Sequence, residues 1–328
     1  MAKKNELLGA VRKNWAGNRV VDGKFVNIDR KPSAFKSITK WSRPFRKERS
    51  VINYGKKWEP ETIMLDNLDS LERNSLIWLG HNSFIINLAG VNIILDPIFG
   101  GVPFVIRKSR LPIDKNKIQP VDLLLLSHDH FDHADKSSVK TLIDNNNHIE
   151  VLAGLGIGKL VRSWSRFVKI NEMGWYQQYE YKGVKITFLP CQHWGKRSIM
   201  DGAKRLWGAF MIEGDGIKIY YSGDSSYAKH FKEIKQLFGG VDYALVGIGA
   251  YKPRWFLERN HLSPNEALDA AEDMGAAVTI PMHYGTFKLS EEPLFDPPIV
   301  FKSEALRRGM KFEIPSLGGV VKLNKGNF

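Results

Sequence analysis

Cysteine is almost absent from this sequence, with Cys191 the only one in 328 residues. An intrachain disulfide and a cysteine-rich zinc or iron–sulfur site are therefore excluded. No apolar run approaches the roughly 18 residues that a membrane-spanning helix requires. Two lysines among the first eight residues have no apolar stretch behind them, so we expect no secretory signal and a cytoplasmic protein. Internal repeats and low-complexity segments are also missing, which excludes solenoid and fibrous classes.

Acidic residues are scarce at the start of the chain. Residues 1–60 contain 16 basic and 5 acidic residues, whereas the remaining 268 residues contain 32 and 30. We therefore expect a basic N-terminal arm over 1–60 and one domain over 61–328. Leu7, Leu8, Val11 and Trp15 recur at helical spacing among lysines and arginines, which predicts a short basic amphipathic helix. This arm either packs on the domain or makes peripheral contact with an anionic inner-membrane surface.

Short apolar runs separated by Gly, Asn and Asp begin near Leu76 and predict consecutive strands. The run Val121–Ser127 is apolar from Leu123 to Leu126, which is typical of a buried central strand. Later runs of strands are followed by helical segments, and Ser263-Pro264-Asn265-Glu266 has the pattern of a helix-capping box. Two runs of strands, each followed by helices, indicate two packed sheets with helices outside them.

The segment Ser127-His128-Asp129-His130-Phe131-Asp132-His133 contains three histidines and two aspartates directly after the buried strand. In an extended segment alternate residues face the same way, so His128 and His130 are placed to bind one metal ion. Asp132 and His133 follow where the chain turns and are placed to face a second ion. The chain has nine histidines in all, so this density favours a metal site over a solvated polar loop.

One loop supplies at most four ligands, and further candidates follow later strands. His193 comes after the run Ile186–Leu189, Asp224 after Ile219–Ser222, and His283 after Val278–Met282. Sheet proteins gather their sites at such strand ends. Taken singly, each residue is also compatible with ordinary packing, but together with the histidine-rich loop they make seven ligands, enough for two ions that share a carboxylate.

The pattern His128-x-His130-x-Asp132-His133 followed by His193, Asp224 and His283 resembles the metallo-β-lactamase superfamily. The resemblance narrows to the branch of N-acyl-phosphatidylethanolamine-hydrolysing phospholipase D over roughly residues 40–300. The motifs that carry it are Trp78-Leu79-Gly80-His81-Asn82-Ser83-Phe84, Asp96-Pro97-Ile98-Phe99, Pro190-Cys191-Gln192-His193-Trp194, Leu206-Trp207-Gly208, the segment from Ile248 to Phe256, and His283-Tyr284-Gly285-Thr286-Phe287. Two small departures, Ser225-Ser226 where the branch often has Thr-Gly and Tyr284 where it has Trp, remove no ligand.

This resemblance implies an α/β fold built as a four-layer αββα sandwich. It implies two Zn²⁺ or other divalent first-row ions, with His128, His130 and His193 on one ion, and Asp132, His133 and His283 on the other. Asp224 would bridge the two, and a metal-bound hydroxide would act as the nucleophile. Asp132, Asp224 and His261 are the expected catalytic residues, with His261 contacting the substrate or donating a proton.

Several neighbouring residues are expected to support the site. Asp96 and His81 are candidates for orienting a metal ligand or lining the pocket. Lys196, Arg197, Lys204 and Arg205 flank His193, where they would neutralise a phosphate or simply be solvated. An apolar stretch, Ile98–Ile106, precedes Arg107, Lys108 and Arg110, a combination suited to an acyl chain with an anionic head group or to a packed covering loop.

The sequence is compatible with more than one function. The favoured one is a phosphodiesterase of phospholipase D type acting on N-acyl-phosphatidylethanolamine-like glycerophospholipids. The alternative is a lactonase or phosphodiesterase acting on a small soluble phosphate-bearing substrate. A nucleic-acid-binding protein or nuclease that uses the basic arm on phosphates is less favoured. The intact ligand set argues against a non-catalytic metalloprotein. The pattern leaves open whether the protein forms a homodimer.

Overall fold

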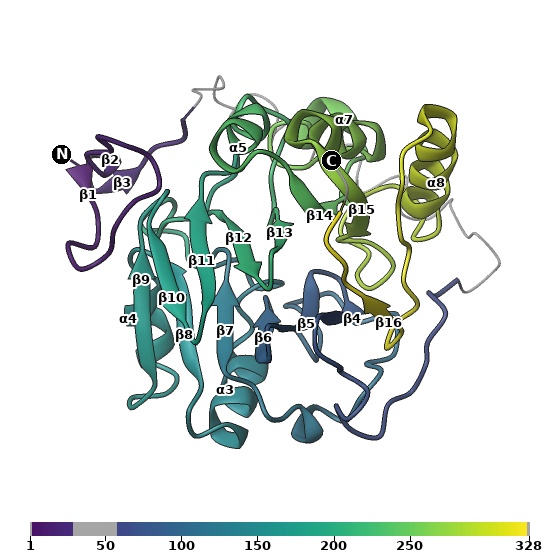
Figure 1. The fold of residues 1–328 in the computed structure, drawn as a ribbon, viewed down its shortest axis with the longest axis horizontal. Coiled ribbons are helices and arrows are strands. Elements are labelled where there is room, and N and C mark those ends of the chain that lie inside the picture. The colour runs from purple at the N-terminus through teal and green to yellow at the C-terminus, as the bar shows by residue number, and fades with distance from the viewer. Residues whose placement is uncertain (1, 29–57, 327–328) are drawn as a thin grey trace.

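The computed structural model of the protein describes residues 2–28 and 58–326, and most of its strands form two sheets packed face to face (Figure 1). The first sheet has the strand order β16-β4-β5-β6-β7-β8-β9, and the second runs from β10 to β15 in sequence order. The first sheet contains β4 (Ser75–Gly80), β5 (Ser83–Leu88), β6 (Val91–Leu95), β7 (Leu123–Leu126), β8 (Glu150–Gly154), β9 (Lys169–Met173) and β16 (Val320–Lys322). The second contains β10 (Gln178–Tyr181), β11 (Val184–Leu189), β12 (Ala209–Gly214), β13 (Ile217–Tyr221), β14 (Val241–Gly247) and β15 (Ala276–Met282).

Helices cover the outer faces of both sheets, so the predicted αββα layering is confirmed (Figure 1). The first sheet is covered by α3 (Lys136–Asn145) and α4 (Ile157–Arg162), and the second by α5 (His230–Phe238), α7 (Pro264–Met274) and α8 (Asp296–Arg308). Two short helical segments, η1 (Lys115–Lys117) and α6 (Arg254–Leu257), lie in connections. The predicted capping box is present, because the Ser263 hydroxyl accepts a hydrogen bond from the Glu266 amide and the Glu266 carboxylate accepts one from the Ser263 amide.

The alternation of side chains along each strand divides the apolar residues between two cores. In β4, Leu76 and Trp78 lie in the core between the sheets, whereas Ile77 and Leu79 face the core under α3 and α4. Successive strand residues point to opposite faces, so a strand that is covered on both sides must be apolar throughout. This explains why β4 and β7 appear as uninterrupted apolar runs.

In the two large sheets, three strands lack a long apolar run and were missed by the sequence analysis: β9, β10 and β16. Each lies at the edge of its sheet, and polar residues such as Lys169, Asn171 and Glu172 occupy β9. Edge strands have few neighbours to pack against and avoid long apolar stretches. Their pairing is therefore decided by the rest of the sheet rather than by their own composition.

The predicted amphipathic helix near the N-terminus is wrong. Residues 2–28 instead contain β1 (Ala2–Lys3), β2 (Asn18–Val21) and β3 (Lys24–Phe25), with turns between them. The backbone from Asn5 to Val11 bonds to the body: Gln177 Nε2 donates to the carbonyls of Asn5 and Leu8, and Val11 N donates to Tyr176 O. These contacts satisfy groups that a helix would have paired internally. Residues 29–57 of the arm lie outside the described residues.

Candidate metal centre

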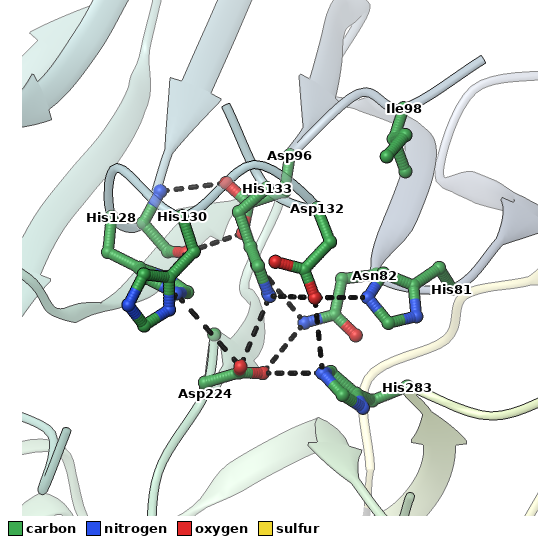
Figure 2. A network of polar contacts seen from close by, with 12 residues as sticks. His81, Asn82, Asp96, Ile98, His128, His130, Asp132, His133, Asp224 and His283 are labelled. Atoms are coloured by element: carbon green, nitrogen blue, oxygen red, sulfur yellow. Dashed lines mark hydrogen bonds and ion pairs between the residues drawn. The ribbon is translucent and has the colours of Figure 1, made fainter. Parts of the chain in front are cut away.

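The candidate ligands follow the carboxyl ends of strands that run in the same direction within each sheet. In the first sheet these strands are β4, β6 and β7, and in the second they are β11, β13 and β15. They lead respectively to His81, Asp96, the loop His128–His133, His193, Asp224 and His283. Because carboxyl ends of parallel strands meet at one edge, residues far apart in the sequence converge there (Figure 2).

Three histidines and one aspartate form the first cluster: His128, His130, His193 and Asp224. The Nδ1 atom of His130 lies 2.9 Å from His128 Nε2 and 3.2 Å from His193 Nε2. Asp224 Oδ2 lies 3.7 Å from His193 Nε2 and 4.0 Å from His128 Nε2. All four ligand atoms lie within 4.8 Å of one another, which is the proximity that one shared ion requires.

The second cluster contains Asp132, His133 and His283, joined by His81. The Nε2 atoms of His133 and His283 lie 3.8 and 3.9 Å from Asp132 Oδ2, and all four ligand atoms are within 4.8 Å of one another. Asp224 also reaches this cluster, since its carboxylate oxygens are 3.2 Å from His133 Nε2 and 3.3 Å from His283 Nε2. Asp224 therefore faces both clusters, as the resemblance implied for a bridging ligand.

Hydrogen bonds around the rings determine which nitrogen faces the centre. His193 Nδ1 lies 3.0 Å from the carbonyl oxygen of Asn260 and must donate to it, so its Nε2 presents a lone pair to the cluster. His133 Nδ1 lies 2.7 Å from Asp96 Oδ2, and its Nε2 is buried without a hydrogen-bond partner although a carboxylate oxygen is near. Buried lone pairs that converge on one another and on carboxylates fit divalent cations with nitrogen and oxygen ligands.

Asp96 is the buried anchor of the second cluster. Its carboxylate accepts hydrogen bonds from the amide and hydroxyl of Ser127, from the Tyr221 hydroxyl at 2.7 Å and from the His133 ring. The Ser127 amide lies 2.7 Å from Asp96 Oδ1. One carboxylate thus joins the ends of β6, β7 and β13 and contacts the ring of His133, a candidate ligand.

Asn82 and Tyr221 were missed by the sequence analysis. Asn82 Nδ2 donates to Asp224 Oδ1 at 3.2 Å, and the Tyr221 hydroxyl lies 3.0 Å from the carbonyl of Asn82. Asn82 follows His81 in a turn, and Tyr221 appears in the sequence as one more apolar residue of β13. Only their tertiary contacts reveal them, although the position of Asn82 inside the quoted His81 motif was a weak signal.

Of the four basic residues near His193, Arg197 and Arg205 form contacts within the fold instead of facing the site. Arg197 Nη1 donates to the carbonyls of Asp129 and Ala134, and its guanidinium lies over the rings of Phe131 and Trp164. Arg205 pairs with Asp129 and Asp201. The expectation that Arg197 and Arg205 neutralise a substrate phosphate is therefore corrected, since both hold the histidine-rich loop. Lys196 is half-buried and Lys204 exposed.

A close approach near Asp224 requires glycine. Gly223 has a φ of +52°, and a Cβ atom there would lie 2.8 Å from Ser127 Cβ and 3.0 Å from the Gly208 carbonyl oxygen. Any other residue would combine backbone strain with a clash. The glycine thus allows the Asp224 turn to pack directly on the start of the histidine-rich loop.

Comparison with known proteins identifies the family. The β-lactamase superfamily domain model matches residues 91–284, more than half of the chain. N-acyl-phosphatidylethanolamine-hydrolyzing phospholipase D 1 of Caenorhabditis elegans is 30% identical over 72% of this chain and 70% of its own length. The chain belongs to the metallo-β-lactamase superfamily. It is a metal-dependent hydrolase of that superfamily, and its clusters of His and Asp residues are able to bind metal.

Two other relatives differ in how much of their length is matched. The mitochondrial N-acyl-phosphatidylethanolamine-hydrolyzing phospholipase D of Saccharomyces cerevisiae is 30% identical over 67% of this chain, which spans 49% of the yeast protein. A UPF0173 metal-dependent hydrolase of Methanopyrus kandleri is 28% identical over 73% of this chain and 94% of its own length. This chain is thus similar both to relatives whose names state a substrate and to one whose name does not.

Solved structures support the metallo-β-lactamase fold. Igni18, a metallo hydrolase from Ignicoccus hospitalis, superposes with a TM-score of 0.59 at 22% identity, covering 75% of this chain and 97% of its own. The isothiocyanate hydrolase from Delia radicum gut bacteria gives a TM-score of 0.62 at 16% identity, covering 76% of this chain and 99% of its own. Across residues 2–28 and 58–326, no helix is both long and apolar enough to span a bilayer.

The histidines of this metallo-β-lactamase centre divide by the direction of their pKa shift. Burial lowers the pKa of His81 to about 3 and that of His261 to about 4, and it lowers the pKa of three further histidines: His128, His130 and His193. Burial alone would also lower the pKa of His133 and His283, but the carboxylates of Asp224 and Asp132 raise it. His261 is therefore uncharged at neutral pH.

These shifts predict acid sensitivity of the metal-free protein. Below pH 6.5 the histidines with lowered pKa become protonated in the unfolded chain but stay neutral in the folded protein. Because the unfolded state then binds more protons, the free energy of unfolding decreases as the pH is lowered. The two histidines with raised pKa are already protonated in this window and do not offset the loss. We expect the free energy of unfolding to fall between pH 6.5 and 4 by about 1.4 kcal/mol per pH unit for each histidine that stays neutral.

Urea unfolding in the presence of a chelator, at a series of pH values, measures this slope. His81→Gln removes one such histidine and should flatten the slope by its share. A stability that stays constant or rises as the pH is lowered through this window would contradict the prediction.

Proposed function

We propose that this metallo-β-lactamase superfamily hydrolase is a phosphodiesterase of phospholipase D type that acts on N-acyl-phosphatidylethanolamine-like glycerophospholipids. It would release a phosphatidic acid and an N-acylated amino alcohol. The observation that carries the proposal is the pair of apolar, exposed loops that adjoin the metal clusters. Relatives in C. elegans and S. cerevisiae whose names carry this activity, each 30% identical, support the substrate class.

The first loop follows Asp96. Val102 and Val105 exchange backbone hydrogen bonds of 3.1 and 3.0 Å, which places the fully exposed Phe104 in a tight turn. The base of the loop is rigid, because Arg107 donates to the carbonyls of Leu79 and Ile98 at 2.6 and 2.8 Å. A large apolar side chain held in water by a rigid turn suits contact with acyl chains.

The second loop follows His193. Ile199 is 90% exposed, and Met200 beside it is also exposed. The loop closes where Ala203 N donates to Gly195 O at 2.8 Å, and Asp201 accepts hydrogen bonds from the amides of Arg197 and Ser198. Like the first loop, this one leaves apolar side chains in solvent while hydrogen bonds hold its backbone. The fold itself therefore exposes Ile199 and Met200.

The proposed chemistry requires two divalent ions, and zinc is the proposed identity, since imidazole and carboxylate ligands suit it without any thiolate. When bound, such ions lower the pKa of a water molecule towards about 7 and stabilise the charge that develops on the phosphate. The residues of the chain supply the rest. Asp132 is held by His81, whose Nε2 lies 3.1 Å from Asp132 Oδ2. The neutral His261, with Nδ1 3.7 Å from Asp224 Oδ2, is positioned to contact a substrate oxygen.

Substitutions in the two loops should separate lipid from soluble substrates. We expect Phe104→Asp combined with Ile199→Asp to lower hydrolysis of N-acyl-phosphatidylethanolamine in vesicles at least about tenfold, because two buried apolar contacts are each worth about 1.5–3 kcal/mol. Hydrolysis of a soluble phosphodiester chromogen should change little, since neither side chain is a metal ligand.

Phe167→Asp is the matched control. Phe167 is 98% exposed but lies among residues that precede β7 and β8, at the opposite ends of the strands from the metal centre. It should leave both activities unchanged. Equal effects of the loop variant on both substrates would contradict a lipid interface. Activity on lactones or small phosphodiesters without any on lipid would support the soluble-substrate alternative instead.

A further inference from the structure

The N-terminal segment extends from its own small sheet to the metal centre. Phe25 N, at the end of β3, donates to Ala203 O at 2.8 Å, in the loop that follows His193. Two residues later, Asn27 Nδ2 donates to the backbone carbonyl of His193 at 2.7 Å. Asn27, which lies 166 residues before His193 in the sequence, thus binds the backbone of a candidate metal ligand.

The orientation of the Asn27 amide follows from its other partner. Trp207 Nε1 lies 3.0 Å from Asn27 Oδ1, and an indole nitrogen is a donor only. The amide oxygen therefore faces Trp207, and the amide nitrogen must face His193. The side chain of Phe25 is buried in the core, and in an extended segment residues two apart face the same way, which directs Asn27 toward the body.

His193 is consequently held at both ends. Its ring Nδ1 donates to Asn260 O at 3.0 Å, which leaves Nε2 directed at His130. Its backbone carbonyl is bound by Asn27, and the preceding residue is tied to the Asp224 turn because Gln192 N donates to Ser225 Oγ at 3.0 Å. Asn260 and Gln192 belong to the domain itself, whereas Asn27 is the contribution of the N-terminal segment.

We propose that Asn27 is a positioning residue of the metal centre. By holding the backbone of His193, it couples the docking of the N-terminal segment to metal binding at the cluster of His128, His130 and His193. The inference rests on His193 being a metal ligand and not on the identity of the substrate. Coupling of this kind is reciprocal, so metal binding must in turn stabilise the docked segment.

Metal affinity provides the first test. Competition between the protein and a chromogenic chelator for Co²⁺ measures affinity at the cluster of His128, His130 and His193. We expect Asn27→Ala to lower this affinity about tenfold, the lower end of the range for losing a residue that supports a metal ligand. The Co²⁺ absorption spectrum of that variant should also shift, because ligand geometry changes.

Asn67→Ala is the matched control, since Asn67 is an exposed asparagine outside the N-terminal segment whose side-chain amide donates to Asp69 Oδ2 at 2.6 Å within its own loop. It should leave Co²⁺ affinity and spectrum unchanged. Equal affinities for Asn27→Ala and Asn67→Ala would overturn the proposal. If His193→Ala keeps full Co²⁺ binding, His193 is not a metal ligand and the proposal is overturned, whatever the substrate proves to be.

Hydrogen–deuterium exchange of the unmodified protein tests the reciprocal effect without any variant that might misfold. The Phe25 amide is bonded to Ala203 only while the segment is docked. Peptides containing Phe25 should exchange several-fold more slowly with Co²⁺ than after chelation. Identical exchange in the two states would show that docking and metal binding are independent, and would overturn the proposal.

Discussion

Asp224→Ala should reduce the rate of hydrolysis by on the order of 10³-fold or more. Losses of this size are expected when one of several residues that act together in catalysis is removed. The two carboxylate oxygens of Asp224 lie 3.2 Å from His133 Nε2 and 3.3 Å from His283 Nε2, and one of them lies 3.7 Å from His193 Nε2. Loss of this carboxylate removes negative charge from both clusters at once. Elemental analysis should therefore find close to two ions in the unmodified protein and fewer than one in the variant.

Asp69→Ala is the control for Asp224→Ala, because Asp69 is an exposed aspartate whose carboxylate contacts Asn67 on the surface. It should retain full activity and metal content. Turnover by Asp224→Ala at the unmodified rate would remove Asp224 from the site. A ratio near one ion in the fully active unmodified protein would instead contradict the two-metal arrangement.

Asp96→Ala should have the largest effect on stability. The substitution leaves the Ser127 amide and the His133 Nδ1 proton without their buried acceptor. The Tyr221 and Ser127 hydroxyls also lose this carboxylate and keep only Asn82 O and His128 Nδ1, respectively, as neighbours. Each unsatisfied buried donor costs about 1–3 kcal/mol, and breaking such a network typically costs about 3–5 kcal/mol in total. Urea unfolding of the chelated protein measures this loss directly.

Asp96→Ala should also lower metal affinity by about 10–100-fold, because His133 loses the carboxylate that orients its ring. Asp96→Asn is the informative companion, since it keeps the volume and one acceptor oxygen and should destabilise the fold less. Asp69→Ala again provides the unaffected control. If Asp96→Ala unfolds at the same urea concentration as the unmodified protein and binds metal equally well, the anchoring role of Asp96 would be wrong.

The N-terminal segment illustrates how a local pattern can mislead. Leu7, Leu8, Val11 and Trp15 have helical spacing, yet Gly9 lies among them and Asn14 adopts a φ of +57°. Leu7 is exposed, whereas Leu8, Val11 and Trp15 pack against the core, so the apolar side chains were informative about burial but not about conformation. The partner that decides the conformation, Gln177, lies 172 residues from Asn5.

Charge near a site was a similarly incomplete guide. Arg197 and Arg205 flank His193 in the sequence, which suggested phosphate binding. In the fold their acceptors are the carboxylates of Asp129 and Asp201 and backbone carbonyls of the histidine-rich loop. A guanidinium forms bonds with whichever acceptors the fold places around it, and sequence proximity does not identify them.

By itself, the sequence determined the apolar strands, the layered architecture and the strand ends at which ligand-type residues lie. These follow from local rules, because a doubly covered strand must be apolar and a polar residue directly after it must lie at the edge of the sheet. Tertiary structure alone decided that Asp224 faces both clusters, that Asp96 and Tyr221 meet behind His133, and that Asn27 binds the carbonyl of His193. Such contacts join residues up to 166 positions apart and depend on distances of a few ångströms between strand ends, which no local pattern encodes.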